Sequence, residues 1–217
     1  MEENIREIPA RSGSAGRKSF GRLVKSGFKI LGRYFYRSFP VVLMEKRLRE
    51  EPSPPTILAW REAGPDDLVL LGEFLPTGKI RLFRKRFQNR EYCLVGLEAG
   101  KIAHYFWLTV GESYLDREMD YRIDLRPDKG YLYDAYTRPA FRGRGCYQEA
   151  FQEAGRFLRN RGREILLVII SGGNEPARAA ALRAGFRPAA VILHRRILAR
   201  KRNLIIRTSD GEQLADS

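Results

Sequence analysis

The pattern of apolar and polar positions along this chain predicts a sheet enclosed by helices. Residues 92–110 form two strand-like runs joined by Glu-Ala-Gly-Lys, which is typical of a hairpin. The unbroken apolar run in residues 164–170 indicates a strand that is covered on both faces. Further stretches have the composition of strands: residues 119–125, 130–137, 189–198 and 203–207.

Helical spacing of apolar residues appears on both sides of these strands. Residues 146–162 have this spacing and end at a glycine, which marks a helix stop. Residues 174–186 are rich in alanine, with Pro176 near the start and Gly185 at the end, as in a short helix. Further helix candidates are residues 65–75 and 79–90. The predicted fold is α/β (α+β), with a mixed, mostly antiparallel central sheet and helices on both faces.

Residues 17–39 carry a different pattern, with apolar side chains on one side of a helix and basic side chains on the other. No acidic residue interrupts residues 8–44. The pattern predicts a basic amphipathic helix ahead of the sheet. A proline-rich break at residues 50–56 favours a domain boundary. The expected organisation is a flexible tail (1–16), a basic helical arm (17–50), a globular domain (51–206) and a flexible C-terminal tail (207–217).

Charge narrows the classes of partner. The 217 residues include 40 Lys and Arg against 26 Asp and Glu, a net charge of +14. Such an excess attracts phosphates, nucleic acid or anionic lipid, and does not by itself distinguish them. Cys93 and Cys146 are too few for a disulfide framework and fit a reducing compartment. No apolar run approaches the length that spans a bilayer, so we expect a soluble cytoplasmic protein.

A glycine-rich cationic loop, Arg142-Gly143-Arg144-Gly145, lies between a predicted strand and a predicted helix. N–H groups of a helix's first turn point outward, and the helix dipole adds partial positive charge there. Glycines let an anion approach these amides without a Cβ in the way. The arrangement predicts an anion cradle, and the alternative is an exposed basic turn. The spacing fits neither the phosphate loop of nucleoside triphosphatases nor the dinucleotide fingerprint.

Residues 131–145, Tyr-Leu-Tyr-Asp-Ala-Tyr-Thr-Arg-Pro-Ala-Phe-Arg-Gly-Arg-Gly, resemble motif A of the GNAT superfamily of acyl-CoA-dependent N-acetyltransferases. Arg142 and Gly145 match the motif, whereas Tyr147 stands where glycine or alanine is usual. A second element is similar to the family's Asn-x-x-Ala…Gly-Phe, with matches at Asn174, Ala177, Gly185 and Phe186. The resemblance covers about residues 56–206 and implies a GNAT-like acyltransferase domain.

The resemblance implies acetyl-CoA, or another acyl-CoA, as cosubstrate, and no metal. The loop amides would bind the CoA pyrophosphate, and the preceding strand would pair with the pantetheine arm. Asn174 would hydrogen-bond that arm, although an N-cap is an equally good local role. The residues expected to bind the cosubstrate are Ala135, Tyr136, Thr137, Arg142, Gly143, Arg144, Gly145, Cys146, Tyr147, Asn174 and Arg178.

The implied reaction is direct attack of an amine on the thioester carbonyl, which needs a base for the amine and a proton for the leaving thiolate. The candidate bases are Glu98, at the hairpin, and Asp134, which alternates with Leu132 and Tyr136 on one strand face. The alternative for Asp134 is a salt bridge with an arginine. Many family members carry a general-acid tyrosine where this chain has Ala181.

Tyr136 and Tyr133 are the nearest candidate acids. Cys146, at a helix start, suggests either an unusually acidic thiol or a small buried side chain. His104 lies on an apolar strand, where a lone histidine is usually structural.

Our first hypothesis is therefore that the protein is an N-acyltransferase, with a primary amine as acceptor. The alternative is a non-catalytic acyl-CoA sensor or membrane-associated regulatory module. Residues 18–37 could contact anionic membrane at the inner face, or pack on the domain or on a second copy in a homodimer. A nucleic-acid binder ranks last, because no reader helix or aromatic RNA-binding surface is present.

Overall fold

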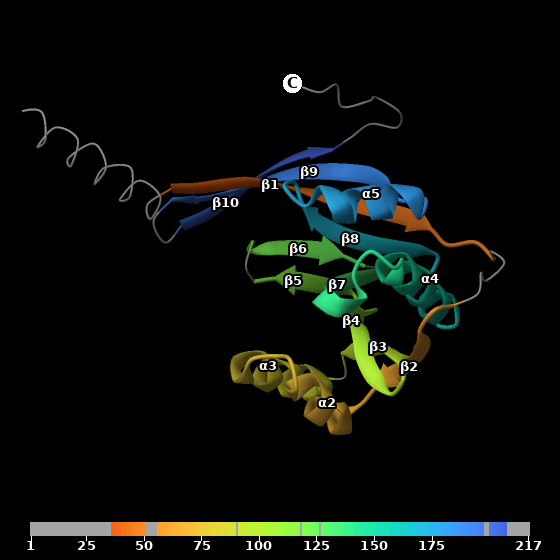
Figure 1. The fold of residues 1–217 in the computed structure, drawn as a ribbon. Coiled ribbons are helices and arrows are strands. Elements are labelled where there is room, and N and C mark those ends of the chain that lie inside the picture. The colour runs from red at the N-terminus through yellow and green to blue at the C-terminus, as the bar shows by residue number, and fades with distance from the viewer. Residues whose placement is uncertain are drawn as a thin grey trace, which may run out of the picture.

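A computed structural model describes residues 36–50, 56–89, 91–117, 119–125, 127–197 and 200–207. Its centre is an eight-stranded sheet in the order β10-β9-β1-β8-β7-β4-β3-β2 (Figure 1). Neighbouring strands are antiparallel except β7 and β8, which are parallel. The strands are β1 (Tyr36–Arg47), β2 (Ala59–Ala63), β3 (Tyr92–Glu98), β4 (Lys101–Thr109), β7 (Lys129–Thr137), β8 (Ile165–Ser171), β9 (Arg187–Ile197) and β10 (Arg200–Arg207). The predicted mixed, mostly antiparallel sheet is confirmed.

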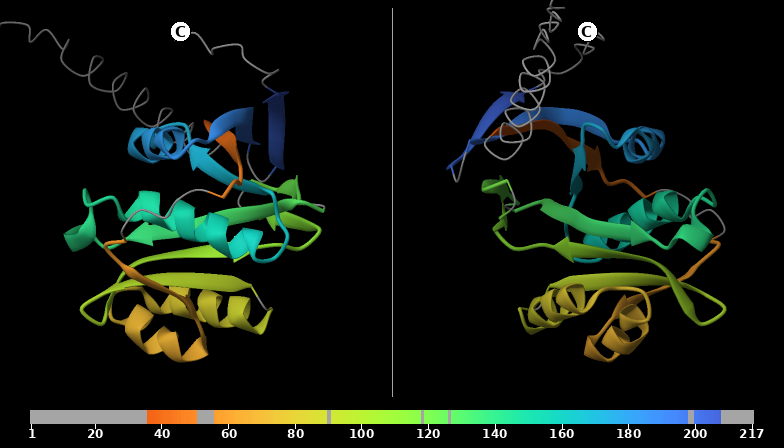
Figure 2. Two further views of the ribbon diagram at one scale, coloured as in Figure 1. Left: turned by 90° about the vertical axis from the view of Figure 1, so that its right-hand side faces the viewer. Right: turned by 60° about the vertical axis from the view of Figure 1, so that its left-hand side comes forward.

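Helices cover both faces of the sheet, as the sequence predicted (Figure 2). One face carries α2 (Leu68–Gly72), α3 (Thr77–Gln88) and a separate hairpin of β5 (Ser113–Asp116) with β6 (Tyr121–Asp124). The other face carries α4 (Cys146–Arg159) and α5 (Glu175–Arg183). Short 3-10 turns precede α2 and α4: η1 (Pro65–Asp67) and η2 (Pro139–Phe141).

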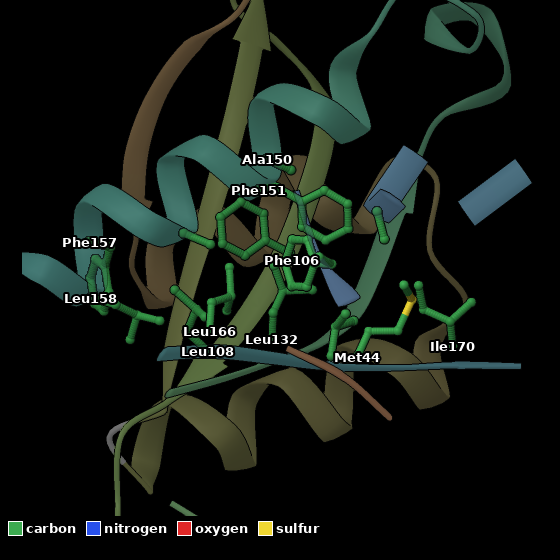
Figure 3. Close-up of a cluster of buried hydrophobic side chains, with 14 of the residues drawn as sticks. Met44, Phe106, Leu108, Leu132, Ala150, Phe151, Phe157, Leu158, Leu166 and Ile170 are labelled. Carbon is green, nitrogen blue, oxygen red and sulfur yellow. The ribbon is translucent and has the colours of Figure 1, made fainter. Parts of the chain in front are cut away.

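Each face of the sheet has its own apolar core. Along β4, Phe106 and Leu108 pack beneath α4, whereas Tyr105 and Trp107 pack beneath α3. Figure 3 shows side chains of α4 and of several strands meeting in the α4-face core. The predicted burial of β8 on both faces follows the same alternation, because successive side chains of a strand point to opposite faces.

Residues 36–47 form strand β1, although the sequence pattern placed them in a helical arm outside the domain. β1 lies between β8 and β9, and Val42 and Met44 enter the α4-face core. The cationic spacing that suggested a helix continues into this segment, but its β-branched and aromatic residues favour a strand. The correct start of the domain is therefore at or before residue 36. Residues 17–35 of the predicted arm, the tail at 1–16 and residues 208–217 lie outside the described residues. Arg207, where the C-terminal tail was expected to begin, is the last residue of β10.

The strand expected at residues 119–125 is shorter and does not belong to the central sheet. It forms β6 and pairs only with β5, a strand that the sequence pattern missed. In the described part of the chain, no helix has the length and apolar character needed to cross a membrane.

The place of β1 in the core generates a stability prediction. Met44 is 1% exposed, so Met44→Ala should lower the free energy of unfolding by about 2–5 kcal/mol, through lost burial and a cavity. Leu204→Ala on β10 is the matched control; Leu204 is 51% exposed, and the change should stay within about 0.5 kcal/mol. Urea denaturation measures both. Equal small losses would contradict the placement of β1 in the core.

Candidate functional site

Strands β7 and β8 run side by side for only part of their length. Their parallel pairing extends from Lys129 and Ile165 to Leu132 and Val168. β7 then continues to Thr137 and β8 to Ser171 without pairing between them, although all these residues are described. The backbone of the last part of β7 consequently presents an open edge toward β8, to which an extended ligand can add as a strand does.

A β-bulge lies in β7 just beyond the last paired residue. Tyr105 of β4 is opposite Tyr136 and Trp107 is opposite Tyr133, so both Asp134 and Ala135 lie opposite Phe106. Asp134 has a φ of 49°, in the left-handed region. Bulges bend the strand that contains the extra residue and increase its twist. The bulge therefore accounts for the separation of β7 from β8.

The bulge also corrects the expected alternation of side chains. Leu132 packs in the α4-face core, as strand period predicts. Asp134 instead contacts α3 on the opposite face, where Tyr133 and Tyr136 also pack. The predicted grouping of Asp134 with Leu132 on one face is wrong, because the extra residue shifts the period by one position.

The glycine loop leads into α4 with its amides uncovered. Gly143 and Gly145 have φ of 75° and 83°, and no atom lies within 4 Å of where a Cβ would be at either position. Gly145 is the N-cap of α4, and no side chain caps the helix there. Among the described residues, the N–H groups from Gly143 to Tyr147 have no backbone acceptor. We call these amides the cradle, because unpaired N–H groups at a helix start can receive an anion.

The N–H group of Arg142 is not free to bind a phosphate, although this was expected of the loop amides. Its N–H donates to the carbonyl of Pro139 at 3.2 Å and so does not belong to the cradle. Its side chain lies beside the end of β7, where Nε donates to the Thr137 carbonyl at 3.1 Å. The guanidinium lies 5.8 Å from the centre of the Tyr136 ring. Its contribution to an anion site would thus be the charge of the side chain.

Tyr147, which replaces the usual small residue of the motif, does not fill the cradle. Its ring points inward, with its centre 5.7 Å from that of His104 and 4.9 Å from that of Phe151. Burial raises the pKa of Tyr147 to about 12. The large side chain of Tyr147 therefore leaves the loop amides uncovered, because its ring packs in the core.

His104 and Cys146 both have buried, structural surroundings. His104 Nδ1 lies 2.7 Å from Thr137 Oγ1, at the end of β7, and burial lowers the pKa of His104 to about 3. The thiol of Cys146 donates to the Phe141 carbonyl at 3.3 Å, and burial raises its pKa. These surroundings favour the small buried side chain over the acidic thiol.

Glu98 lies beside the cradle but is occupied by an ion pair. Both of its carboxylate oxygens accept from the guanidinium of Arg144, whose side chain is 42% exposed. The hydrogen bond from Arg144 holds the pKa of Glu98 below its usual range. A carboxylate with a lowered pKa is a weak proton acceptor, so the arrangement disfavours Glu98 as a general base.

Asp134 forms salt bridges, which was the alternative that the sequence analysis gave to a role as general base. Its carboxylate accepts from Lys79 Nζ and from Arg86 Nη1, each at 2.6 Å. The side chain is 17% exposed. Because each oxygen faces a cation, neither is open to an incoming ammonium group.

The hydroxyl group of Tyr136 on β7 has no hydrogen-bond partner among the described residues, and the same is true of the buried Tyr131. The Tyr133 hydroxyl donates to Glu91, and burial raises the pKa of Tyr133. The Tyr136 ring is half-buried and stacks on Phe74, with centres 6.2 Å apart and planes 13° apart. Ala135 and Thr137 flank it on the open edge.

The residues predicted at the start of α5 and along it have other partners than the glycine loop. Asn174 Oδ1 accepts from the N–H of Ala177 at 3.3 Å, so Asn174 is the N-cap. Ala181 is fully buried in the α4-face core. Arg178 lines a groove of about 420 Å³ that is formed by β1, α5 and β9, and not by β7 or α4. The structure therefore does not place Arg178 with the loop.

Sequence reasoning missed Glu149 on the first turn of α4. Its buried carboxylate accepts from the N–H groups of Ile57 and Leu58, at 2.6 and 3.2 Å, and from Trp60 Nε1 at 3.2 Å. These bonds fasten the start of β2 to the helix that carries the cradle. The signal in the sequence is an acidic residue among apolar ones, but it does not reveal partners that lie about 90 positions away.

The sequence pattern of the acetyltransferase (GNAT) family matches residues 42–186. A GNAT-family acetyltransferase from Colwellia psychrerythraea has 13% identity and a TM-score of 0.53, over 79% of this chain and 59% of that one. A GCN5-related N-acetyltransferase from Sphaerobacter thermophilus has 17% identity and a TM-score of 0.52, over 80% and 56%. The enzyme AAC(6')-Iy, in complex with a bisubstrate analogue, has 15% identity and a TM-score of 0.50, over 61% and 92%.

This chain spans little more than half the length of the first two of these structures. At such low identities, the structural likeness concerns the fold. No protein of curated function matches the sequence. The family pattern, however, covers most of the chain and includes the cradle, strands β7 and β8, and α5. The chain therefore belongs to the GNAT acetyltransferase family.

Proposed function

We propose that this protein is an acyl-CoA-dependent N-acyltransferase that uses acetyl-CoA and an amine acceptor. One observation carries the proposal: uncovered amides from Gly143 to Tyr147 adjoin the point where β7 and β8 separate. An anion site and an open strand edge, placed end to end, fit a pyrophosphate followed by an amide-containing arm. CoA has this chemistry.

In the proposed complex the cradle amides bind the pyrophosphate, and Arg142 adds a full positive charge beside it. The backbone of Ala135 to Thr137 pairs with the pantetheine amides, which directs the thioester toward the bulge. Acetyl-CoA supplies the activated acyl carbon. The acceptor nitrogen attacks that carbon, the carbon–sulfur bond breaks, and the electron pair leaves with the thiolate.

The proton transfers follow from the groups that remain available. Asp134 and Glu98 are both held in ion pairs, so we assign removal of the amine proton to water at the open edge of β7. Tyr136, with its unbonded hydroxyl, is the residue proposed to protonate the thiolate. A thiol pKa of about 8.5 makes this a modest requirement, since the thiolate is already a fair leaving group.

The alternative function is an acyl-CoA sensor without turnover. A specific observation favours it. Ala181 occupies the position at which many family members have a general-acid tyrosine, and Ala181 is fully buried in the core. Calorimetry with acetyl-CoA, together with thiol release across a panel of amines, separates the two functions. The panel should contain an aminoglycoside, a primary alkyl amine and a peptide N-terminus. Binding heat without thiol release for any acceptor supports the sensor.

The cradle generates a charge-reversal prediction. Arg142→Glu should weaken acetyl-CoA binding by about tenfold or more, because an anion then faces the phosphates. Thiol release should fall in parallel at subsaturating acetyl-CoA. Arg122→Glu on β6 is the matched control, because it makes the same change in net charge at another exposed position and should leave both values unchanged. Equal effects of the two variants would argue against a local phosphate site.

We also propose that the basic segment ahead of β1 contacts anionic membrane at the inner, cytoplasmic face. The structure places Tyr36 and Arg37 in β1, so the proposed contact is confined to residues 18–35, which lie outside the described residues. The support is the sequence pattern, with cations on one side of the predicted helix and apolar residues on the other. The competing arrangement packs the apolar side on the domain or on a second copy.

Vesicle flotation tests this contact. The full chain should float with vesicles of phosphatidylcholine and phosphatidylglycerol, and not with phosphatidylcholine alone. Lys25→Glu with Lys29→Glu should weaken binding by about tenfold or more, since each lysine near an anionic surface contributes about 1 kcal/mol. Lys85→Glu with Lys101→Glu is the matched control on the domain. Unchanged flotation of the first variant would favour packing on protein, which light scattering can resolve into monomer or dimer.

A further inference from the structure

The bulge in β7 is fastened to α3 by a pair of cations. Asp134, the residue with positive φ, accepts from Lys79 at one oxygen and from Arg86 at the other. Both cations belong to α3, one near each end of the helix. We call this three-residue arrangement the bulge clamp. It joins the strand to the helix at the position where regular pairing with β8 has just ended.

Arg86 is held in a fixed position by the rings around it. Its guanidinium carbon lies 5.0 Å from the centre of the Trp107 ring and 4.9 Å from that of Tyr133. Trp107 and Tyr133 are opposite each other on β4 and β7, in the last regular pair before the bulge. The side chain of Arg86 is 12% exposed. The clamp therefore starts from a largely covered cation that is stacked on aromatic rings.

The conformation of Asp134 needs such support. A side chain with positive φ is strained unless its surroundings hold it, although aspartate tolerates this region better than most residues. Without the clamp, β7 can relax toward regular pairing or rotate its open edge. The direction of Ala135, Tyr136 and Thr137 depends on which of these happens.

We propose that Asp134 is a positioning residue, which acts through Arg86 and Lys79 to hold the open edge of β7 in the orientation that receives the acyl-CoA donor. The proposal rests on the proposed function, since it assigns the donor arm to this edge. It gives Asp134 no part in proton transfer. A general base would need an oxygen open to the acceptor, whereas both oxygens of Asp134 face cations on α3.

Two variants separate positioning from base catalysis. Asp134→Asn keeps the shape of the side chain and its tolerance of positive φ, but removes the charge. Arg86→Met breaks the clamp from the other side and leaves the carboxylate of Asp134 in place. If Asp134 positions the edge, both variants should raise the dissociation constant of acetyl-CoA, measured by calorimetry, by about tenfold. The Michaelis constant for acetyl-CoA should rise with it, and the acid limb of the pH–rate profile should persist in Asp134→Asn.

Asp67→Asn is the matched control for loss of a buried carboxylate. Asp67 is 10% exposed and pairs with Arg61 at 2.6 Å, and it lies in η1, outside β7 and α4. This variant should lower the melting temperature without changing the affinity for acetyl-CoA. Melting temperatures of all variants show whether each one folds.

Each contrary result has a definite meaning. If Asp134→Asn binds acetyl-CoA as the wild type does, the positioning role is overturned while the proposed function stands. If Arg86→Met leaves affinity unchanged and only Asp134→Asn abolishes turnover, Asp134 is a base. If Asp67→Asn weakens binding equally, the effect is general destabilisation and the proposal fails. Absence of binding by the wild-type protein overturns the proposed function, and the positioning role with it.

Discussion

The structure depends on the point at which β7 and β8 stop pairing. A parallel pair in the middle of a sheet normally continues to the ends of both strands, because each unpaired backbone group in a buried position is costly. Here pairing ends at Leu132 and Val168, and a bulge follows at once. Under the proposed function, the opened backbone of β7 is the surface that pairs with the donor arm. The groups at its two ends would then determine which donor binds.

At one end the cradle supplies positive potential without burying a charge. Helix α4 begins at Cys146 after a glycine N-cap, so its first amides face outward. Tyr147 and Glu149 attach the first turn of this helix to the rest of the domain. The tyrosine packs on His104, and the carboxylate accepts from the start of β2. At the other end, ion pairs with Lys79 and Arg86 occupy the carboxylate of Asp134. Glu98, beside the cradle, is paired with Arg144. These surroundings combine unpaired N–H groups with few accessible carboxylates, which is compatible with the proposed reaction because that reaction has a good leaving group.

Much of the fold could be predicted because the relevant signals are local. The apolar run of β8, the hairpin of β3 and β4, and the glycines that bound α4 and α5 each specify their own element. Partners across long sequence distances could not be predicted in this way. Nothing near Asp134 indicates that Arg86 will meet it, and a one-residue bulge is invisible in a period of two. The cationic spacing that resembled a helix extended into β1, where strand-forming residues and burial between two strands prevail.

The position of β1 also sets the order in which the sheet can be completed. Its neighbours, β8 and β9, are joined to it by contacts such as Val42 with Ile170 and Val41 with Ile192. A ribosome releases β1 long before either neighbour exists. Strand β1 therefore stays unpaired, with its apolar residues exposed to solvent, until most of the chain has emerged from the ribosome. The chain loses the entropy of closing such long loops before strand pairing can stabilise it, so this half of the sheet should fold late and slowly. Chaperones therefore have the longest time to bind this part of the chain.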